Sequence, residues 1–323
     1  MEYTKLGRSG LTVSRLCLGT MNFGRVLDEG ESHKLLDVAA DAGITYIDTA
    51  NTYGWQEYKG RTEEILGSWF AAAPSRREGT VLATKVYQSM GQSPNDEGLS
   101  ARNIVRHCEG SLRRLQTDRI DVYQMHHVDR SVPWDEIWQA MEQLVAAGKV
   151  LYVGSSNFAG WDVAQAMETA RARHFFGLVS EQSVYNLCQR SIELEVIPAC
   201  QAYGVAVVPW SPLNGGVLSG PDDRPTRSRS HEPRPTAYAE SHRDQLAAWH
   251  GLCEDAGLAP AEAALAWLLH REGVTAPIIG PRTQEQLDGA VRALSHQLDA
   301  VMLARLDTIF PGPGGPAPEA YAW

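Results

Sequence analysis

Residues 46–54 read YIDTANTYG. The stretch opens like a buried strand, and then a carboxylate, Asp48, stands where another apolar side chain would continue it. Tyr53 follows five residues later, just before Gly54. Because a lone buried carboxylate is costly, Asp48 needs a partner from elsewhere in the chain. The pattern therefore indicates a strand that ends in a polar site.

Seven more apolar segments of this kind recur along the chain, and helical patterns such as VPWDEIWQAMEQLVAAG separate them. They are rich in β-branched residues and alternate only weakly, which is typical of strands buried on both faces. The eight segments are RLCLGTM (15–21), YIDTA (46–50), VLATKV (81–86), IDVYQMHH (120–127), VLYVGSSN (150–157), LVSEQSVYN (178–186), VAVVPWS (205–211) and APIIG (276–280).

Eight successive strand–helix units predict a closed (β/α)8 TIM barrel, formed by residues 1–323 as a single domain. The alternative, a doubly wound open sheet, usually carries GxGxxG after its first strand, whereas this chain has GTMNFG there. We also expect an N-terminal hairpin at about 1–14 and an irregular tail at about 310–323.

A long loop is expected after strand 7, at about 212–240, where the regular spacing of the strands breaks. It is rich in Gly, Pro, Ser and Arg, which fits either a surface insertion or a lid over an anionic cofactor. The arginines that favour the lid are Arg224, Arg227, Arg229 and Arg234.

Composition narrows the class of protein. The net charge of −10 disfavours a general nucleic-acid surface. No apolar run approaches the roughly 20 residues of a membrane helix, and the first residues lack the apolar core of a secretory signal. Five scattered cysteines without a CxxC pair predict reduced thiols in a cytoplasmic protein without a metal site. The sequence leaves open whether the protein forms an oligomer.

Four polar residues fall at or just after successive strand ends, where barrels of this kind carry their chemistry. We expect Asp48 to pair with Lys85, whose ammonium favours the phenolate of Tyr53 and so suits that residue to donate a proton. His126 would orient a carbonyl oxygen. Each residue alone also fits an ion pair or a loop aromatic, but the four together favour a catalytic site.

Substrate contacts are harder to place. Successive side chains on a strand point to opposite faces, so only one of His126 and His127 is expected to face the barrel. Trp55, His127 and Arg130 are candidates for the wall of a substrate pocket, and each fits packing or surface exposure equally well.

The motifs DTANTYG, ATK, DVYQMHH, GSSNF, SEQSVYN, PWSPL and IIGPRTQEQL resemble those of the aldo-keto reductase family, in that family's order and over essentially the whole chain. The resemblance implies a barrel that binds NADP(H) and a catalytic tetrad with Tyr53 as proton donor. The implied tetrad is Asp48, Tyr53, Lys85 and His126. The implied cofactor contacts are Thr20, Met21 and Asp48 near the nicotinamide, Ser156, Asn157, Gln182 and Trp210 around its carboxamide and ring, Ser211, Leu213 and Gly216 under the pyrophosphate, and Gly280, Arg282 and Gln286 toward the adenosine.

Side-chain chemistry supports these implied roles. Ser, Asn and Gln offer both donors and acceptors to a carboxamide, and the guanidinium of Arg282 suits a 2′-phosphate, which favours NADPH over NADH. The family's last motif often continues QLxEN, but here Asp288, Gly289 and Ala290 follow. Two expected contacts at the adenine end are therefore missing.

A narrower resemblance, carried by LGTMNFG, YVGSSNFAGWDVAQA and the EAYAW tail, is to actinobacterial reductases of deoxysugar pathways. These relatives are NDP-hexose 2,3-enoyl reductases or ketoreductases, and we expect this chain to reduce the carbonyl of an aldehyde, a ketone or an NDP-linked keto-sugar. The alternative is reduction of a 2,3-enoyl C=C bond in an NDP-sugar, for which the resemblance implies a glutamate where His126 stands. A third reading is a cofactor-binding regulatory subunit similar to the potassium-channel β subunits.

Overall fold

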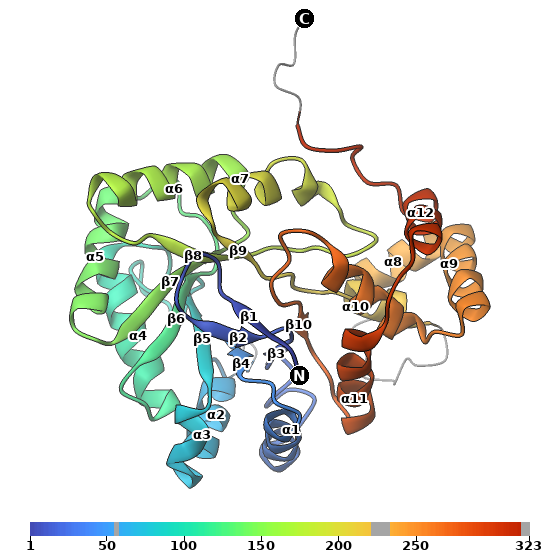
Figure 1. The fold of residues 1–323 in the computed structure, drawn as a ribbon. Coiled ribbons are helices and arrows are strands. Elements are labelled where there is room, and N and C mark those ends of the chain that lie inside the picture. The colour runs from blue at the N-terminus through green and yellow to red at the C-terminus, as the bar shows by residue number, and fades with distance from the viewer. Residues whose placement is uncertain (55–57, 221–232, 318–323) are drawn as a thin grey trace, which may run out of the picture.

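The computed structural model describes residues 1–54, 58–220 and 233–317, except for the side chain of Arg234. Eight parallel strands form one sheet in the order β10-β3-β4-β5-β6-β7-β8-β9 (Figure 1). Backbone bonds between its two edges close it: Thr275 N donates to Val207 O and Ile278 N to Pro209 O, both at 2.8 Å. The strands are β3 Cys17–Gly19, β4 Tyr46–Asp48, β5 Val81–Val86, β6 Ile120–Met125, β7 Val150–Ser156, β8 Leu178–Gln182, β9 Ala206–Val207 and β10 Ile278–Ile279. Each lies in one of the eight predicted segments, and the (β/α)8 barrel is confirmed.

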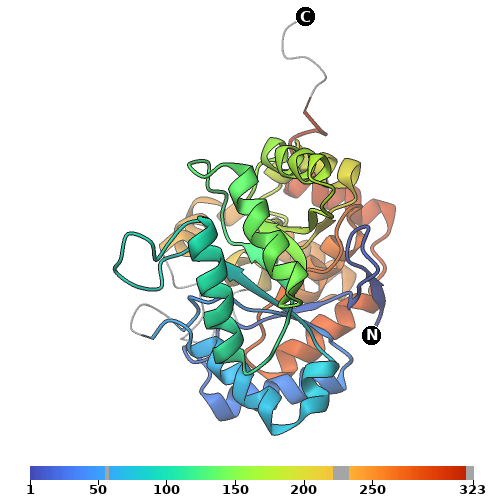
Figure 2. The ribbon, with the colours of Figure 1, turned by 90° about the vertical axis from the view of Figure 1, so that its left-hand side faces the viewer.

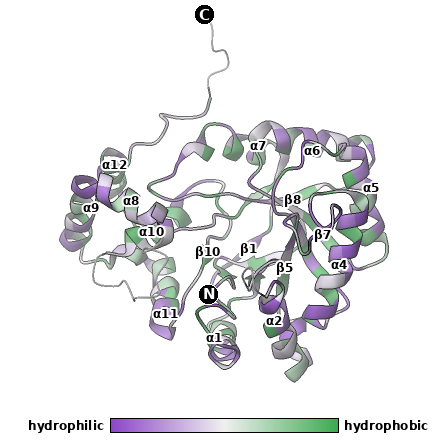
Figure 3. Cartoon of the chain, turned by 180° about the vertical axis from the view of Figure 1, so that it is seen from behind, coloured by the Kyte–Doolittle hydropathy of each residue, from purple (hydrophilic) through white to green (hydrophobic). Residues whose placement is uncertain are grey.

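Helices surround the barrel, and the outer ones carry both hydrophilic and hydrophobic residues (Figure 3). On α4, for example, Ile104, Cys108 and Leu112 recur at helical spacing and are buried against the sheet. The α-helices are α1 Glu29–Asp41, α2 Arg61–Ala72, α3 Pro74–Glu78, α4 Ala101–Leu115, α5 Trp134–Ala146, α6 Gly160–Ala172, α7 Val196–Tyr203, α8 Pro233–Ser241, α9 Arg243–Ala256, α10 Pro260–His270, α11 Gln284–Arg292 and α12 Ala300–Ile309. Short 3₁₀ turns lie at Ser191–Glu193, Asn214–Ser219 and Ala293–Ser295. Helices α8, α9 and α12 gather on the side of the barrel away from α5 (Figures 1 and 2).

A two-stranded antiparallel hairpin precedes the barrel, with β1 at Tyr3–Lys5 and β2 at Thr12–Ser14. Its Leu6 and Val13 are fully buried in the same apolar cluster as Tyr46 and Val122, whose side chains fill the barrel interior. The hairpin thus closes the end of the barrel where the strands begin and leaves the opposite end for polar residues.

The loop expected at about 212–240 is described in part. It contains the 3₁₀ turn at Asn214–Ser219 and most of α8, whereas the predicted anion-binding Arg224, Arg227 and Arg229, with the side chain of Arg234, lie outside the described residues. The tail from Phe310 to Ala317 is irregular, and residues 318–323 lie outside the description. Two bonds attach this tail to the chain around residue 190: Arg190 Nη1 donates to Phe310 O at 2.8 Å and Ala317 N to Leu194 O at 2.7 Å.

Within the described part of the chain, no helix combines the length and apolar character that a membrane span requires.

Candidate active site

Asp48, Lys85 and Tyr53 meet at the end of the barrel where the strands finish. Lys85 Nζ donates to Asp48 Oδ2 at 2.6 Å, to Thr49 O at 2.9 Å and to Tyr53 Oη at 3.2 Å. The Lys85 side chain is fully buried and that of Asp48 nearly so. The expected pair is therefore formed, and it holds an ammonium against a phenol oxygen.

The neighbours of Lys85 keep its side chain protonated. Burial by itself lowers the pKa of Lys85, but the Asp48 carboxylate and then Tyr53 outweigh burial, so that its pKa lies above the ordinary value. Lys85 consequently stays protonated at neutral pH, and its charge faces the oxygen of Tyr53.

Two glutamines hold the other oxygen of the Asp48 carboxylate. Gln124 Nε2 and Gln182 Nε2 donate to Asp48 Oδ1 at 2.9 and 2.8 Å. Gln182 was expected only as a cofactor ligand, and Gln124 was missed. The signal for Gln124 was available, since it stands two residues after Val122 and so shares the face of strand β6 that Val122 turns to the barrel interior.

His126 lies directly after strand β6, with its ring centroid 6.1 Å from that of Tyr53. Burial, and then the charges of Lys85 and His127, hold the pKa of His126 well below its usual range, so its imidazole is neutral at pH 7. Among the described residues, the buried Nδ1 atom of this ring has no hydrogen-bond partner. A neutral imidazole beside a phenol is suited to a hydrogen bond with a polar group of a ligand.

The expectation that His126 and His127 face opposite sides is wrong. Their rings stack, with centroids 5.5 Å apart and an angle of 11° between the planes. The physical reason is that β6 ends at Met125, so the alternation of a strand no longer applies to the two histidines. Both border the same cavity, which keeps His127 as a candidate substrate contact.

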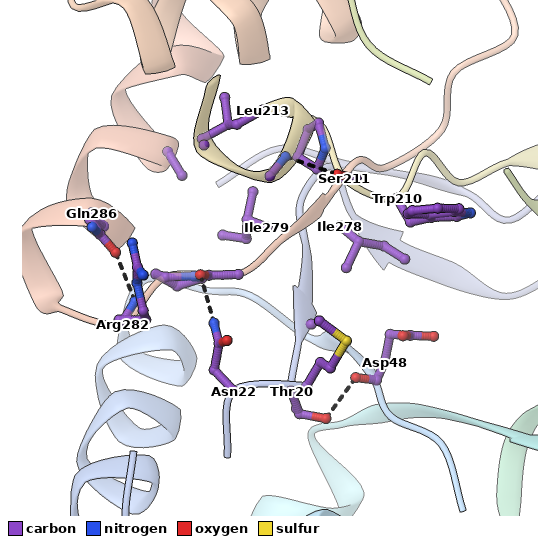
Figure 4. A pocket seen from close by; sticks show the side chains of 18 of the residues that line it. Thr20, Asn22, Asp48, Trp210, Ser211, Leu213, Ile278, Ile279, Arg282 and Gln286 are labelled. Carbon is purple, nitrogen blue, oxygen red and sulfur yellow. Dashed lines mark hydrogen bonds between the residues drawn. The ribbon is translucent and has the colours of Figure 1, made fainter. Parts of the chain in front are cut away.

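The cavity above these residues has a volume of about 1160 Å³ and continues from the tetrad along β10 to α11. Figure 4 shows Asp48 and Trp210 at one end, Arg282 and Gln286 at the other, and Ile278 and Ile279 between them. All the predicted cofactor contacts line this cavity: Thr20, Met21, Asp48, Ser156, Asn157, Gln182, Trp210, Ser211, Leu213, Gly216, Gly280, Arg282 and Gln286.

The expected carboxamide contacts bond to one another. Trp210 Nε1 donates to Asn157 Oδ1 at 3.1 Å, and Asn157 Nδ2 donates to His126 O at 3.0 Å. Ser156 Oγ donates to the backbone oxygen of Gln182 at 2.8 Å. These bonds fix the indole ring beside the tetrad, and a bound carboxamide would share or replace some of them.

Next to this cluster lies a buried carboxylate, Glu181, which was not predicted from the sequence. Glu181 is fully buried and accepts hydrogen bonds from Ser155 Oγ, Ser183 Oγ and Phe158 N. Burial raises its pKa to about 7, although these three bonds oppose the rise. Glu181 therefore ties together the ends of β7 and β8, between which Ser156 and Asn157 are presented.

At the far end of the cavity, α11 begins after its N-cap, Thr283, and Gln286 Oε1 accepts from Arg282 N at 2.9 Å. Arg282 is partly buried, which lowers its pKa, but an arginine remains charged under these conditions. A helix N-terminus next to a guanidinium is a suitable site for a phosphate group.

Of the other candidate substrate contacts, Arg130 lies away from this cavity and Trp55 falls outside the described residues. Arg130 lies in a different, smaller hollow, where it bonds to Asp162 at 2.8 Å and lies over the ring of Trp161. The prediction for Arg130 is wrong because the buried Asp162 draws its guanidinium toward α6. Trp55 lies outside the described residues, so its placement remains a prediction.

The residues present fit a nicotinamide dinucleotide. The cavity runs from a polar, aromatic end, which His126 and Trp210 border, to a cationic end at Arg282. No cluster of three or more His, Cys, Asp or Glu among the described residues is placed to hold a metal ion.

Comparison with known proteins agrees with this geometry. The chain is 53% identical to an uncharacterized oxidoreductase, YrpG, of Bacillus subtilis over the full length of both. It is 33% identical to versiconal hemiacetal acetate reductase of Aspergillus parasiticus, covering 92% of this chain and 94% of that one. It is 34% identical to a probable voltage-gated potassium channel subunit beta of Oryza sativa, covering 91% of each. Residues 15–310 match the profile of the Aldo/keto reductase family. With its barrel, its polar cluster and this match, the chain belongs to the Aldo/keto reductase family of oxidoreductase enzymes.

Proposed function

We propose that this enzyme uses NADPH to reduce the carbonyl group of a small polar molecule, with a keto-sugar, such as an NDP-deoxysugar intermediate, as the leading substrate class. The observation that carries the proposal is the chain of contacts from Asp48 through Lys85 to the hydroxyl of Tyr53, with the neutral ring of His126 beside it. A carbonyl oxygen placed between the phenol and the imidazole would have a proton donor and a polarising partner.

Each residue has a definite task in this reaction. Tyr53 gives its proton to the substrate oxygen, and the Lys85 ammonium stabilises the phenolate that remains. Asp48 keeps Lys85 charged and in place. A neutral His126 orients the carbonyl by a hydrogen bond. When bound, NADPH supplies the hydride that the carbonyl carbon receives.

The proposed cofactor contacts divide along the cavity. Ser156, Asn157 and Gln182 would hold the carboxamide, and the Trp210 indole, fixed by Asn157, would cover the nicotinamide ring. Arg282 at the start of α11 would bind a 2′-phosphate, which is the reason for preferring NADPH over NADH. The names of two relatives support reduction: versiconal hemiacetal acetate reductase, and norsolorinic acid reductase of Emericella nidulans, which is 34% identical.

The test of this proposal is a panel of aldehydes, ketones and NDP-linked keto-sugars, incubated with the purified protein and NADPH while cofactor oxidation is followed by absorbance. Replacing Tyr53 with Phe should lower turnover by about 100-fold or more, since general acid catalysis contributes on the order of 100- to 10,000-fold, and should leave NADPH binding intact. Normal turnover in Tyr53→Phe would remove the basis of the proposal.

Reduction of a C=C bond is the second candidate reaction. There the hydride goes to a β-carbon, so the carbonyl must lie deeper in the cavity. With deuterated NADPH, label on the former carbonyl carbon supports carbonyl reduction, and label on the β-carbon of an enone supports the alternative. The histidine at position 126 favours the first.

A regulatory role like that of a potassium-channel subunit is a third candidate, raised by the similarity to the Oryza sativa protein. It predicts tight NADPH binding without turnover on any carbonyl in the panel. In that case Tyr53→Phe would change nothing measurable.

A further inference from the structure

Gly289 has an unusual position at the far end of the cavity. It lies within α11, is buried, and borders the cavity. Glycine weakens a helix interior relative to alanine, so its presence there calls for a reason. A Cβ at this position would lie 3.3 Å from Glu262 Oε1, which is tighter than most contacts of a Cβ, and 3.4 Å from Arg292 Nη2, in direct contact with it. The glycine therefore leaves room for a pair of charged side chains.

That pair is fixed on several sides. Arg292 donates to Glu262 Oε1 from Nε at 3.1 Å and from Nη2 at 2.7 Å. His296 Nε2 lies 2.6 Å from the other oxygen of the same carboxylate. The Glu262 side chain is only 11% exposed, whereas that of Arg292 is 56% exposed and borders the cavity. The guanidinium is thus oriented but remains open to a ligand.

We propose that the guanidinium of Arg292 stacks on the adenine base of the bound dinucleotide. This inference rests on the proposed function, because it requires a nicotinamide dinucleotide in the cavity. Gly289 and Ala290 offer the base a surface without side-chain donors or acceptors, and an arginine face is a good partner for an aromatic ring.

The spacing along α11 agrees with this arrangement. Arg282 stands before the first turn, where a phosphate is favoured, and Gly289 follows two helical turns later, about 10 Å along the axis. A nucleotide can span that separation from its phosphate to its base. Glu262 partly neutralises Arg292, which suits this arginine to a neutral ring more than to a second phosphate.

The test compares three variants by calorimetric binding to the protein without substrate. Arg292→Ala should weaken NADPH and NADH by the same factor, about 3- to 10-fold, since both contain adenine. Arg292→Lys keeps a cation near Glu262 but loses the planar face, and should lose nearly as much. Arg282→Ala should weaken NADPH far more than NADH. Reduced nicotinamide mononucleotide, which has no adenine, should bind all three variants as it binds the wild type.

Each other outcome overturns the inference. A loss in Arg292→Ala that is confined to NADPH would make Arg292 a phosphate ligand, and full rescue by Arg292→Lys would make charge, not stacking, the cause. Weakened binding of the mononucleotide would indicate damage to the whole site. If the wild type turns over carbonyls with NADPH while Arg292→Ala binds normally, only this inference fails. If the wild type binds neither dinucleotide, the proposed function fails with it.

Discussion

Asp48 is tolerated inside the barrel because both of its oxygens are engaged. Oδ2 accepts from Lys85, and Oδ1 accepts from Gln124 and Gln182. A buried charge with fewer partners would lose much of its stabilisation and its fixed orientation. The carboxylate therefore depends on a polar layer that extends across three further strands.

Replacing Gln124 with Leu tests this dependence. We expect the free energy of unfolding to fall by about 1.5–3 kcal/mol, the usual contribution of a hydrogen bond to a charged group. We also expect turnover to fall, because Asp48 would hold Lys85 less firmly. Thermal unfolding and steady-state kinetics measure the two effects. The control is Gln139→Leu, at an exposed position on α5. Unchanged turnover in the Gln124 variant would mean that Gln182 alone suffices.

Glu181 should make the stability of the protein depend on pH. Its folded-state pKa is about 7 against an ordinary 4.5, so the native state holds the proton more tightly than the unfolded chain. Native stability therefore falls as pH rises from about 4.5 to 7 and levels off above that range.

Glu181→Gln removes this titration. The free energy of unfolding of the variant minus that of the wild type should be larger at pH 8 than at pH 5, by on the order of 2 kcal/mol. Chemical unfolding at the two pH values measures the difference between the proteins, which cancels the titration of all other groups. A difference that does not change with pH would show that Glu181 is ionised normally in the fold.

At the scale of an element, α1 begins with a complete capping box. Asp28 Oδ1 accepts from Glu31 N at 2.8 Å, and Glu31 Oε2 accepts from Asp28 N at 2.9 Å. These two bonds satisfy backbone groups that the first helical turn leaves open. The helix stands outside the barrel, away from the residues that border the cavity.

Asp28→Ala should therefore cost about 1 kcal/mol of stability without altering the kinetic constants. The matched control is Asp41→Ala, at the exposed last position of the same helix, where a negative charge is unfavourable and its loss should cost nothing. Denaturant unfolding distinguishes the two variants. An equal loss in both would point to helix propensity or net charge and not to the cap.

For the molecule as a whole, the barrel interior is divided between an apolar end and a polar end. Leu6 and Val13 of the hairpin pack with Tyr46 and Val122 at the first, while Asp48, two residues after Tyr46, belongs to the second. The residues that stabilise the barrel and the polar residues of the site therefore lie at opposite ends, as in other barrels of this architecture.

Leu6→Ala should therefore destabilise the protein by about 2–5 kcal/mol, because Leu6 is fully buried, while the Michaelis constant for NADPH stays unchanged. Thermal unfolding and kinetics measured below the transition check both parts. Val301→Ala, at a position 69% exposed, serves as the control. A changed Michaelis constant would mean that the two ends are coupled.

The sequence by itself determined the barrel and the grouping of Asp48, Tyr53, Lys85 and His126 at one end of it. Eight buried segments of similar spacing left few architectures open, and barrels of this kind carry their chemistry at the ends of the strands. Asp48, Lys85 and His126 could be found in this way because each is local to one segment, and the order of the segments places them at neighbouring strand ends.

Only the tertiary structure decided the contacts that join distant segments. Gln124 and Glu181 read as ordinary strand residues until the carboxylate or hydroxyls that face them are known. Arg130 pairs with Asp162 and lies away from the large cavity, and His127 stacks on His126 because the strand ends at Met125, before both histidines. Sequence periodicity specifies which face a residue takes within an element, but the partner of a polar group depends on which elements pack together.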